Sequence, residues 1–423
     1  MKIFGIQGSS AGLPRLRYLI LGVVISITAP SLVFFSVSSA PYAYAPLIAQ
    51  TCVYSLLATA CSIVLLRSIS QYPGVESTAY IVPSLTIGYG VLLVILILAR
   101  LPYSRVVLFS SFAIVLAWFL MTSIVASRQG QLTIGIVPGG DHKALLAINR
   151  INWVVLEDPG QDTSAMHAIT ADLRSDLPSE WDRQLADFAL AGVPVYHIKH
   201  LAESLTGMVQ LEHLSENSFG TLAPISVFMN AKHILDWLTA IIVLVLLAPV
   251  LMLIALAVRL DSSGPVIFRQ ARIGYRGEMF TVYKFRTMVA ATPGASALDA
   301  AKTQTEDKRI TRIGGFMRRS RIDELPQILN ILKGEMSWIG PRPEARVLSE
   351  WYEKQIPFYR YPHIVRPGLT GWAQVNQGHV AEVEDVQNKL YLDFYYIKNF
   401  SLWIDLLIIA RTIQTVLTGF GAK

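Results

Sequence analysis

Charged residues and cysteines are both scarce in this chain. Only 16% of its 423 residues are Asp, Glu, Lys or Arg, whereas 52% are hydrophobic and the mean hydropathy is +0.44. These values differ from those of ordinary soluble domains and indicate a membrane protein. The only two cysteines, Cys52 and Cys61, lie in apolar sequence. They are too few for a metal cluster, and we interpret them as small hydrophobic residues.

The sequence also lacks the signatures of nucleic-acid-binding and dinucleotide-binding proteins. Its net charge of +6 is concentrated after residue 258, where 23 basic residues face 16 acidic ones. No helix-turn-helix, zinc or RNA-binding pattern accompanies these cations, so we expect no nucleic acid partner. The glycine turn in IVPGGD (136–141) lacks the GxGxxG spacing of a pyrophosphate loop, which favours a scaffolding or oligomerisation role for the region around it.

Four apolar runs begin the chain, each close to the roughly 20 residues that a helix needs to cross a bilayer. They cover residues 18–40, 47–66, 78–99 and 106–127. Basic residues precede the first run and are absent from the loop after it, which places the N-terminus in the cytoplasm. Arg100 and Arg105 argue mildly against this orientation, but they lie at span ends. Residues 1–128 are therefore predicted to be a four-helix transmembrane region whose two ends are cytoplasmic.

Residues 129–225 alternate between short strand and helix patterns. Strands are predicted over Leu132–Val137, Trp153–Leu156 and Val193–Ile198. Helices are predicted over His142–Asn149 and Glu180–Ala191. This alternation favours a small α/β domain with a parallel sheet.

A fifth apolar run, Ile234–Val258, is long enough to span but has basic residues on both sides. Crossing the membrane would export the basic C-terminal part, against the positive-inside tendency. Pro249, near the middle of the run, can break the helix axis. A Pro-kinked span is the commoner structure for such a run, but the charge pattern favours a re-entrant helix over residues 232–259.

The last apolar run, Phe400–Thr418, contains Asp405, Arg411 and Gln414. Charges at the centre of a membrane span are costly, so we expect a helix that lies in the membrane interface. A core helix of the C-terminal domain fits the periodicity equally well.

Asp323 and Glu324 stand at the start of a short apolar helix. Pro326 suits the first helical turn and Gly334 suits the helix end. A helix N-terminus favours anions, so an acid pair there can simply complement the helix dipole. The alternative is a reactive pair, in which one carboxylate holds a cation while the other attacks or accepts a proton.

The basic residues near this pair favour the reactive interpretation. Arg342 stands between Pro341 and Pro343, and its guanidinium can bind phosphate through two hydrogen bonds. Further cations with this role are Lys284, Arg286 and Arg366. Phosphoryl transfer depends mainly on charge neutralisation and positioning, so these residues predict a membrane-anchored phosphate site.

The motifs of the C-terminal half resemble those of the polyprenyl-phosphate hexose-1-phosphate transferases, a family of bacterial sugar transferases. The similar segments are KHILD (232–236), GPVIFRQARIGYRGEMFTVYKFRTM (264–288), RRSRIDELPQILNILKGEMSWIGPRP (318–343), RPGLTGWAQVN (366–376) and KLYLDFYYIKN (389–399). The resemblance implies a catalytic domain over residues 226–423, with Pro249 in a re-entrant helix. For the long members of the family it also implies four N-terminal spans and a Rossmann-like domain.

The resemblance also implies the reaction and its residues. Asp323 would be the nucleophile and Glu324 a Mg²⁺ ligand. Lys284, Arg286, Arg318 and Arg342 would surround the diphosphate of a UDP-sugar. The sugar 1-phosphate would pass to undecaprenyl phosphate at the cytoplasmic face of the bacterial inner membrane, with release of UMP, as the first step of exopolysaccharide, capsule or O-antigen synthesis.

The chain departs from the family pattern at three positions. His233 replaces an Arg, Thr287 replaces a Ser, and Arg321 stands where Ser or Thr is common.

Two alternatives stay open: direct transfer with Asp323 as general base, and a membrane scaffold or sensor without transferase activity. We expect membrane lipid as a partner and a homodimer as the first assembly to test. The sequence does not identify the sugar, the polysaccharide pathway or a ligand of residues 129–225.

Overall fold

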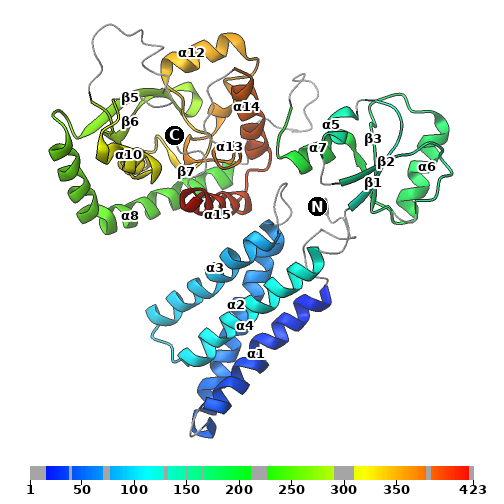
Figure 1. The fold of residues 1–423 in the computed structure, drawn as a ribbon, viewed down its shortest axis with the longest axis horizontal. Helices are drawn as coiled ribbons and strands as arrows, with labels where there is room; N and C mark the ends of the chain where they lie inside the picture. The colour runs from blue at the N-terminus through cyan, green and yellow to red at the C-terminus, as the bar shows by residue number, and fades with distance from the viewer. Residues whose placement is uncertain are drawn as a thin grey trace. The chain divides into compact units, whose positions relative to one another are not determined.

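The chain forms two compact units, Met1–Gly207 and Met208–Lys423, in a computed structural model (Figure 1). The structure describes residues 16–37, 41–69, 77–127, 132–140, 142–148, 151–163, 166–210, 226–289, 309–377 and 383–418.

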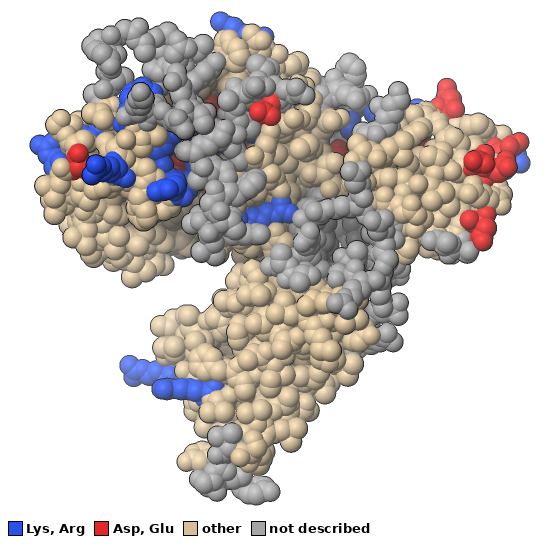
Figure 2. Space-filling model, viewed as in Figure 1, with Lys and Arg blue, Asp and Glu red and all other residues tan. Residues whose placement is uncertain are grey.

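The four N-terminal apolar runs form four helices, as predicted. They are α1 (Leu16–Val37), α2 (Ala45–Ile69, after the 3-10 turn η1 at Pro41–Tyr44), α3 (Ser77–Leu98) and α4 (Arg105–Ser127). The last three are long and apolar enough to cross a membrane, and the apolar stretch of α1, Ile20–Ser36, is shorter. Almost all of their surface seen in Figure 2 carries no charged residue.

Hydroxyl groups and small residues line the inside of this helical bundle. The Tyr89 hydroxyl lies 2.8 Å from both Thr59 Oγ1 on α2 and Ser111 Oγ on α4. Ser111 in turn donates to the Ser26 carbonyl of α1 at 2.9 Å. Because lipid tails are as apolar as leucine, close packing and such hydrogen bonds associate helices in a membrane.

The sheet of the first unit is parallel and has the order β2-β1-β3-β4. Its strands are β1 (Leu132–Ile136), β2 (Ile151–Val155), β3 (Ala168–Ala171) and β4 (Val195–His197). Its helices are α5 (Lys143–Leu146), α6 (Ser179–Leu190) and α7 (Ile198–Thr206). The predicted strands and helices are confirmed within a few residues, but β3 and α7 were not predicted. Residues 211–225 of the predicted domain lie outside the described residues.

The fifth apolar run forms α8 (Ser226–Asp261), a 36-residue helix that contains Pro249 and is also long and apolar enough to span. Figure 1 shows that α8 bends along its length. Before the proline, Ala240, Val243 and Leu244 pack in one hydrophobic cluster of the second unit. After it, Leu251, Ile254, Ala255 and Val258 pack in another. The opposite side of the helix is exposed, with Val245, Leu246, Met252 and Leu253 each about two-thirds accessible.

Short elements fold over the packed side of α8. The strands β5 (Ile267–Ile273) and β6 (Met279–Phe285) form an antiparallel hairpin, and β7 (Ser337–Ile339) and β8 (Gly368–Thr370) pair in parallel. The 3-10 turns are η3 (Tyr275–Gly277), η4 (Ile322–Gln327) and η5 (Tyr361–Ile364). The helices are α10 (Arg312–Arg319), α11 (Ile328–Leu332), α12 (Arg346–Gln355), α13 (Trp372–Asn376), α14 (Val383–Lys398) and α15 (Leu402–Thr418).

The charges of α15 lie on the side that packs against the unit. Asp405 is buried and accepts hydrogen bonds from Lys232 Nζ at 2.7 Å and from the Tyr396 hydroxyl at 2.9 Å. The Arg411 guanidinium lies 4.7 Å from the centre of the Trp372 ring. The core-helix alternative is therefore correct for this side. The exposed residues Leu402, Trp403, Ile409 and Ile413 leave the interfacial position a prediction.

Candidate active site

The two adjacent carboxylates lie on η4, between α10 and α11. The sequence predicted an ordinary helix N-terminus, and the structure has a 3-10 turn there that continues into α11. Pro326 lies inside η4, and the segment ends at Gly334, whose φ of +77° is the left-handed conformation that glycine adopts at helix ends. Both acids are buried.

Glu324 is held by cations. Its Oε1 accepts hydrogen bonds from Lys284 Nζ at 2.7 Å and from Arg342 Nη2 at 2.8 Å, and Arg321 Nη1 lies at 3.8 Å. Although burial acts in the opposite direction, Arg342 and Lys284 hold the pKa of Glu324 well below its usual range. Glu324 is therefore a fixed anion.

Asp323 has a different environment. Its Oδ1 is buried and has no hydrogen-bond partner among the described residues. Burial and the adjacent Glu324 anion raise the pKa of Asp323, while Lys284, Arg342 and Arg321 act against the rise. A carboxylate that has one oxygen without a hydrogen-bond partner, beside a fixed anion and several cations, can attack an electrophile that those cations hold.

The β5–β6 hairpin positions Lys284 and Arg272. Residues 268, 270 and 272 pair with residues 284, 282 and 280, so all six lie on one face of the hairpin. Asn330 of α11 accepts a hydrogen bond from Tyr283 N at 3.2 Å and donates to the Thr281 carbonyl at 2.7 Å, which fixes β6 against the segment that carries the acids. Burial lowers the pKa of Lys284 to about 8.

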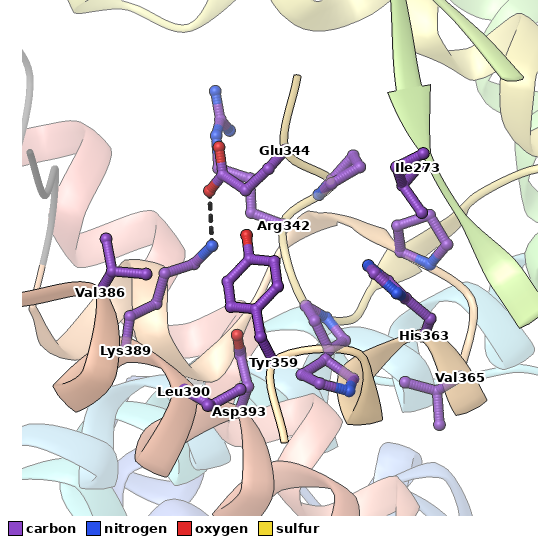
Figure 3. Close-up of a pocket in the computed structure, with 14 residues that line it drawn as sticks. Ile273, Arg342, Glu344, Tyr359, His363, Val365, Val386, Lys389, Leu390 and Asp393 are labelled. Carbon is purple, nitrogen blue, oxygen red and sulfur yellow. Dashed lines mark hydrogen bonds and ion pairs between the residues drawn. The ribbon is translucent and has the colours of Figure 1, made fainter. Parts of the chain in front are cut away.

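The loop that carries Arg342 is fixed on both sides. Gly340 N donates to the Thr370 carbonyl at 2.9 Å, and Arg272 donates to the Pro343 carbonyl. Figure 3 shows Glu344, Lys389 and Asp393 around a cavity beside this loop. Lys389 Nζ donates to Glu344 Oε1 at 2.6 Å, and Lys389 and Arg272 lower the pKa of Glu344 to about 2 against the effect of burial.

Three of the predicted phosphate-binding residues lie apart from Glu324. Arg286 donates to the Ser262 and Pro265 carbonyls at 2.6 and 2.5 Å and so joins β6 to the end of α8. Arg366 donates to the Gly334 carbonyl at 3.0 Å, at the end of the η4–α11 segment opposite to Asp323. Arg318 lies in the last turn of α10, half-buried. Of the five predicted phosphate-binding residues, Lys284 and Arg342 are the two that form ion pairs with Glu324 in the described part of the chain.

The acid pair suits a magnesium ion that also binds phosphate. No group of three His, Cys, Asp or Glu residues within the described stretches could hold a metal by itself. Mg²⁺ ordinarily takes only one or two carboxylates, with substrate phosphates and water as its other ligands. Glu324 Oε2 has only a long contact of 3.5 Å from Arg342, so this oxygen is available for such an ion.

Comparison with known proteins places this site in a family. The sequence profile of the bacterial sugar transferases matches residues 227–419. A UDP-N-acetylgalactosamine-undecaprenyl-phosphate N-acetylgalactosaminephosphotransferase of Aeromonas hydrophila is 45% identical over 354 residues, which cover 84% of this chain and 83% of that protein. This chain belongs to the bacterial sugar transferase family.

Other relatives match a little under half of this transferase. A UDP-glucose:undecaprenyl-phosphate glucose-1-phosphate transferase of Caulobacter vibrioides is 44% identical over 193 residues, or 45% of this chain and 71% of that protein. A protein of the same name from Escherichia coli is 42% identical over 194 residues, or 45% of this chain and 40% of that protein. The prediction of an enzyme of the polyprenyl-phosphate sugar-1-phosphate transferase family is confirmed.

Arg272, Glu344 and Lys389, the charged residues that support Arg342, were not predicted from the sequence. Strand alternation could have found Arg272, because the hairpin register places it on the face of Lys284. No local pattern joins Glu344 to Lys389, which is 45 residues further along the chain. Burial lowers the pKa of Arg272 to about 10, so the transferase has buried more cations around the acid pair than its motifs indicated.

Proposed function

We propose that this transferase moves a sugar 1-phosphate from a UDP-sugar to undecaprenyl phosphate and releases UMP. The relatives are named for this reaction with UDP-N-acetylgalactosamine or UDP-glucose. The observation that carries the proposal is the contrast within the acid pair, because Glu324 is bound by cations while Asp323 Oδ1 is unpartnered. One further relative is named as an exopolysaccharide production protein, and we propose that the product of this transferase begins the synthesis of exopolysaccharide, capsule or O-antigen.

The reaction would proceed in two displacements at one phosphorus atom. An Asp323 oxygen forms a bond to the phosphorus that carries the sugar, and the bond to the bridging oxygen breaks, so that UMP leaves with the electron pair. A phosphate oxygen of undecaprenyl phosphate then attacks the same phosphorus and displaces Asp323. Lys284 and Arg342 neutralise the charge of the diphosphate at both steps, which is the main requirement of phosphoryl transfer.

The site would use Mg²⁺, with Glu324 as its protein ligand. Bound Mg²⁺ neutralises and orients phosphate oxygens. Lys284 and Arg342 fix the Glu324 carboxylate, so Oε2 is preset to receive the ion. Asp323 stays available for attack.

We propose that α8 enters the membrane and returns to the same side. Both ends of α8 bind the same unit: Asp236 accepts from Ser337 Oγ at 2.5 Å near the start, and Arg286 donates to the Ser262 carbonyl at the end. A straight helix of 36 residues would be about 54 Å long, enough to carry its two ends to opposite sides of a bilayer. The Pro249 bend and the exposed apolar side of α8 support re-entry.

Accessibility labelling tests this topology. Val227→Cys and Ser263→Cys, in a background without Cys52 and Cys61, should both react with a membrane-impermeant thiol reagent from the cytoplasmic side. Reaction of the two variants from opposite sides would contradict re-entry. The same experiment tests the inner-membrane location with a cytoplasmic active site.

The sheet of the first unit supports a Rossmann-like assignment for residues 129–225. Its four strands are parallel, and helices cover both faces: α6 packs in one cluster, and α5 and α7 pack in the other. Because its glycine turn lacks the GxGxxG spacing of a dinucleotide-binding loop, we propose that this domain serves assembly of the transferase and not nucleotide binding.

Release of UMP tests the proposed function against the scaffold alternative. The purified transferase with Mg²⁺ and undecaprenyl phosphate should release UMP from UDP-N-acetylgalactosamine or UDP-glucose, and the two donors should differ in kcat/KM. No release from any UDP-sugar would favour a scaffold. Initial rates should follow ping-pong kinetics, whereas intersecting double-reciprocal lines would favour direct transfer with Asp323 as general base.

A further inference from the structure

Asn330 on α11 is a fully buried amide that joins the segment of the acid pair to the strand of Lys284. Its Oδ1 accepts a hydrogen bond from Tyr283 N at 3.2 Å, and its Nδ2 donates to the Thr281 carbonyl at 2.7 Å. Nδ2 also donates to Glu335 Oε2 at 2.7 Å, just after α11. Both N–H groups of the amide are therefore used, and buried groups of this kind are costly to leave unsatisfied.

The Asn330 amide binds β6 along the edge that faces away from β5. Within the described residues, β5 is the only strand that pairs with β6. Thr281 and Tyr283 are two positions apart, and such residues direct their backbone groups to the same edge of a strand. The amide binds one C=O and one N–H there, as a neighbouring strand would. Asn330 thus fixes the position of β6 along α11, whereas the apolar cluster that contains Val282 and Ile328 has no directional preference.

The position of β6 determines where the Lys284 side chain lies. Lys284 follows Tyr283 in β6, and its Nζ donates to Glu324 Oε1 at 2.7 Å. Glu324 lies on η4, which continues into α11, so Asn330 and Glu324 belong to one continuous segment. A shift of β6 by one residue would turn the Lys284 side chain to the opposite face of the hairpin. The contact between Lys284 and Glu324 therefore depends on the hydrogen bonds of Asn330.

We propose that Asn330 is a positioning residue that holds Lys284 against Glu324 for the transfer reaction. This inference rests on the proposed function, in which Lys284 neutralises the charge of the diphosphate. Asn330 is fully buried, so it acts through Lys284 and not on the substrate. Loss of the amide should lower kcat/KM for UMP release by about 100-fold, because a small displacement of a group in the site has an effect of this size.

The reactivity of Lys284 tests the proposal without turnover. Lys284 and Lys389 are matched lysines, because they are 15% and 11% exposed and each donates to a glutamate, at 2.7 and 2.6 Å. In Asn330→Ala, acetic anhydride should acetylate Lys284 about 10-fold faster than in wild type, the effect of one net hydrogen bond on local opening. Lys389 should react at the wild-type rate. Asn399→Ala is the control variant, because it removes a hydrogen bond of 3.0 Å to a carbonyl of α14, and it should change neither rate. Mass spectrometry of the labelled peptides measures both rates.

A double-mutant cycle tests whether Asn330 acts through Lys284. Asn330→Ala should lower kcat/KM by about 100-fold in the wild-type background but by less than about threefold in Lys284→Met. Asn330→Asp is the second variant if Asn330→Ala does not fold. It keeps the acceptor of Tyr283 N and loses both donors, so it should also accelerate acetylation of Lys284.

Three outcomes would overturn the proposal. One is acetylation of Lys284 at the wild-type rate in the Asn330 variants. Another is equal acceleration of Lys284 and Lys389, which would mean that Asn330 stabilises the whole unit. A third is the same fold-loss of kcat/KM in both backgrounds, which would mean that Asn330 does not act through Lys284. Failure of wild type to release UMP would count against the proposed function, and the acetylation rates would still test Asn330.

Discussion

Two largely buried clusters of charged residues flank the Arg342 loop, and each contains one aspartate, one glutamate and one lysine. The dyad cluster contains Asp323, Glu324 and Lys284, and the rear cluster contains Asp393, Glu344 and Lys389. In each, a lysine donates to a glutamate, at 2.7 Å in the dyad cluster and 2.6 Å in the rear cluster. In each, the aspartate is buried and one of its oxygens has no partner among the described residues.

The two clusters differ in their access to substrate. The rear cluster surrounds a cavity of about 30 Å³, room for a water molecule or two but not for a nucleotide. The prolines 341, 343, 362 and 367 also line this cavity. The dyad cluster is bordered by the half-exposed Arg321. We therefore propose that the dyad cluster serves the reaction and that the rear cluster supports Arg342.

The largest expected difference between the clusters is in the rate of UMP release when the aspartate of each is replaced by asparagine. Asp323→Asn removes the nucleophile and should lower kcat/KM for UMP release by about 1,000-fold or more, a loss of about 4 kcal/mol in transition-state stabilisation. Asp393→Asn should stay within about threefold of wild type, since we assign Asp393 to the support of Arg342 and not to substrate binding. Equal losses in the two variants, measured by UMP release at pH 8, would contradict the division of roles.

Breaking the rear ion pair should mainly reduce stability. Glu344→Gln leaves the Lys389 and Arg272 cations without their partly buried anion and removes the charge from the hydrogen bond of Lys389, which should cost about 1.5–3 kcal/mol. Arg346 and Glu350 form an exposed pair at 2.6 Å, so Glu350→Gln is a matched control that should change stability by less than about 1 kcal/mol. Unfolding in urea, followed by tryptophan fluorescence, measures both. If Glu344→Gln and Glu350→Gln have the same midpoint of unfolding in urea, the rear cluster does not stabilise the fold around Arg342.

The rear aspartate should make stability depend on pH. Burial raises the pKa of Asp393 to about 7, and Glu344 adds to the rise while Lys389 opposes it. Arg342, Tyr359 and His363 also line this cavity, and burial lowers the pKa of His363 to about 4.

The sign follows from proton binding. Between pH 4 and 7 the folded protein holds a proton on Asp393 that the unfolded chain has lost, so this group makes stability fall as pH rises through this range. Because the pKa of Asp393 is shifted by about 3 units, its contribution to the free energy of unfolding changes by at most about 4 kcal/mol over this range. Asp393→Asn should therefore gain stability over wild type at pH 8 relative to pH 5, by thermal unfolding. An equal difference in Tm at the two pH values would contradict the shifted pKa.

The sequence predicted the helices of this chain and the acid pair better than the contacts around them. Long apolar runs predicted α1–α4 and α8 because periodicity and length are local properties. The strand β3 was missed because AITA is too short to show alternation. Arg286 and Arg366 were grouped with Arg342 because they are further cations in the basic C-terminal part of the sequence. Their partners are backbone carbonyls at two helix ends, which depend on tertiary packing and leave no local pattern.

Covalent trapping tests the central claim most directly. The transferase is incubated with Mg²⁺ and a UDP-sugar that carries ³²P in the phosphate attached to the sugar, without undecaprenyl phosphate, and the labelled peptide is identified. Wild type and Asp393→Asn should retain label on the peptide that contains Asp323 and lose it when undecaprenyl phosphate is added, whereas Asp323→Asn should retain none. Wild type that transfers the sugar phosphate when lipid is present but never carries label without it would contradict the account.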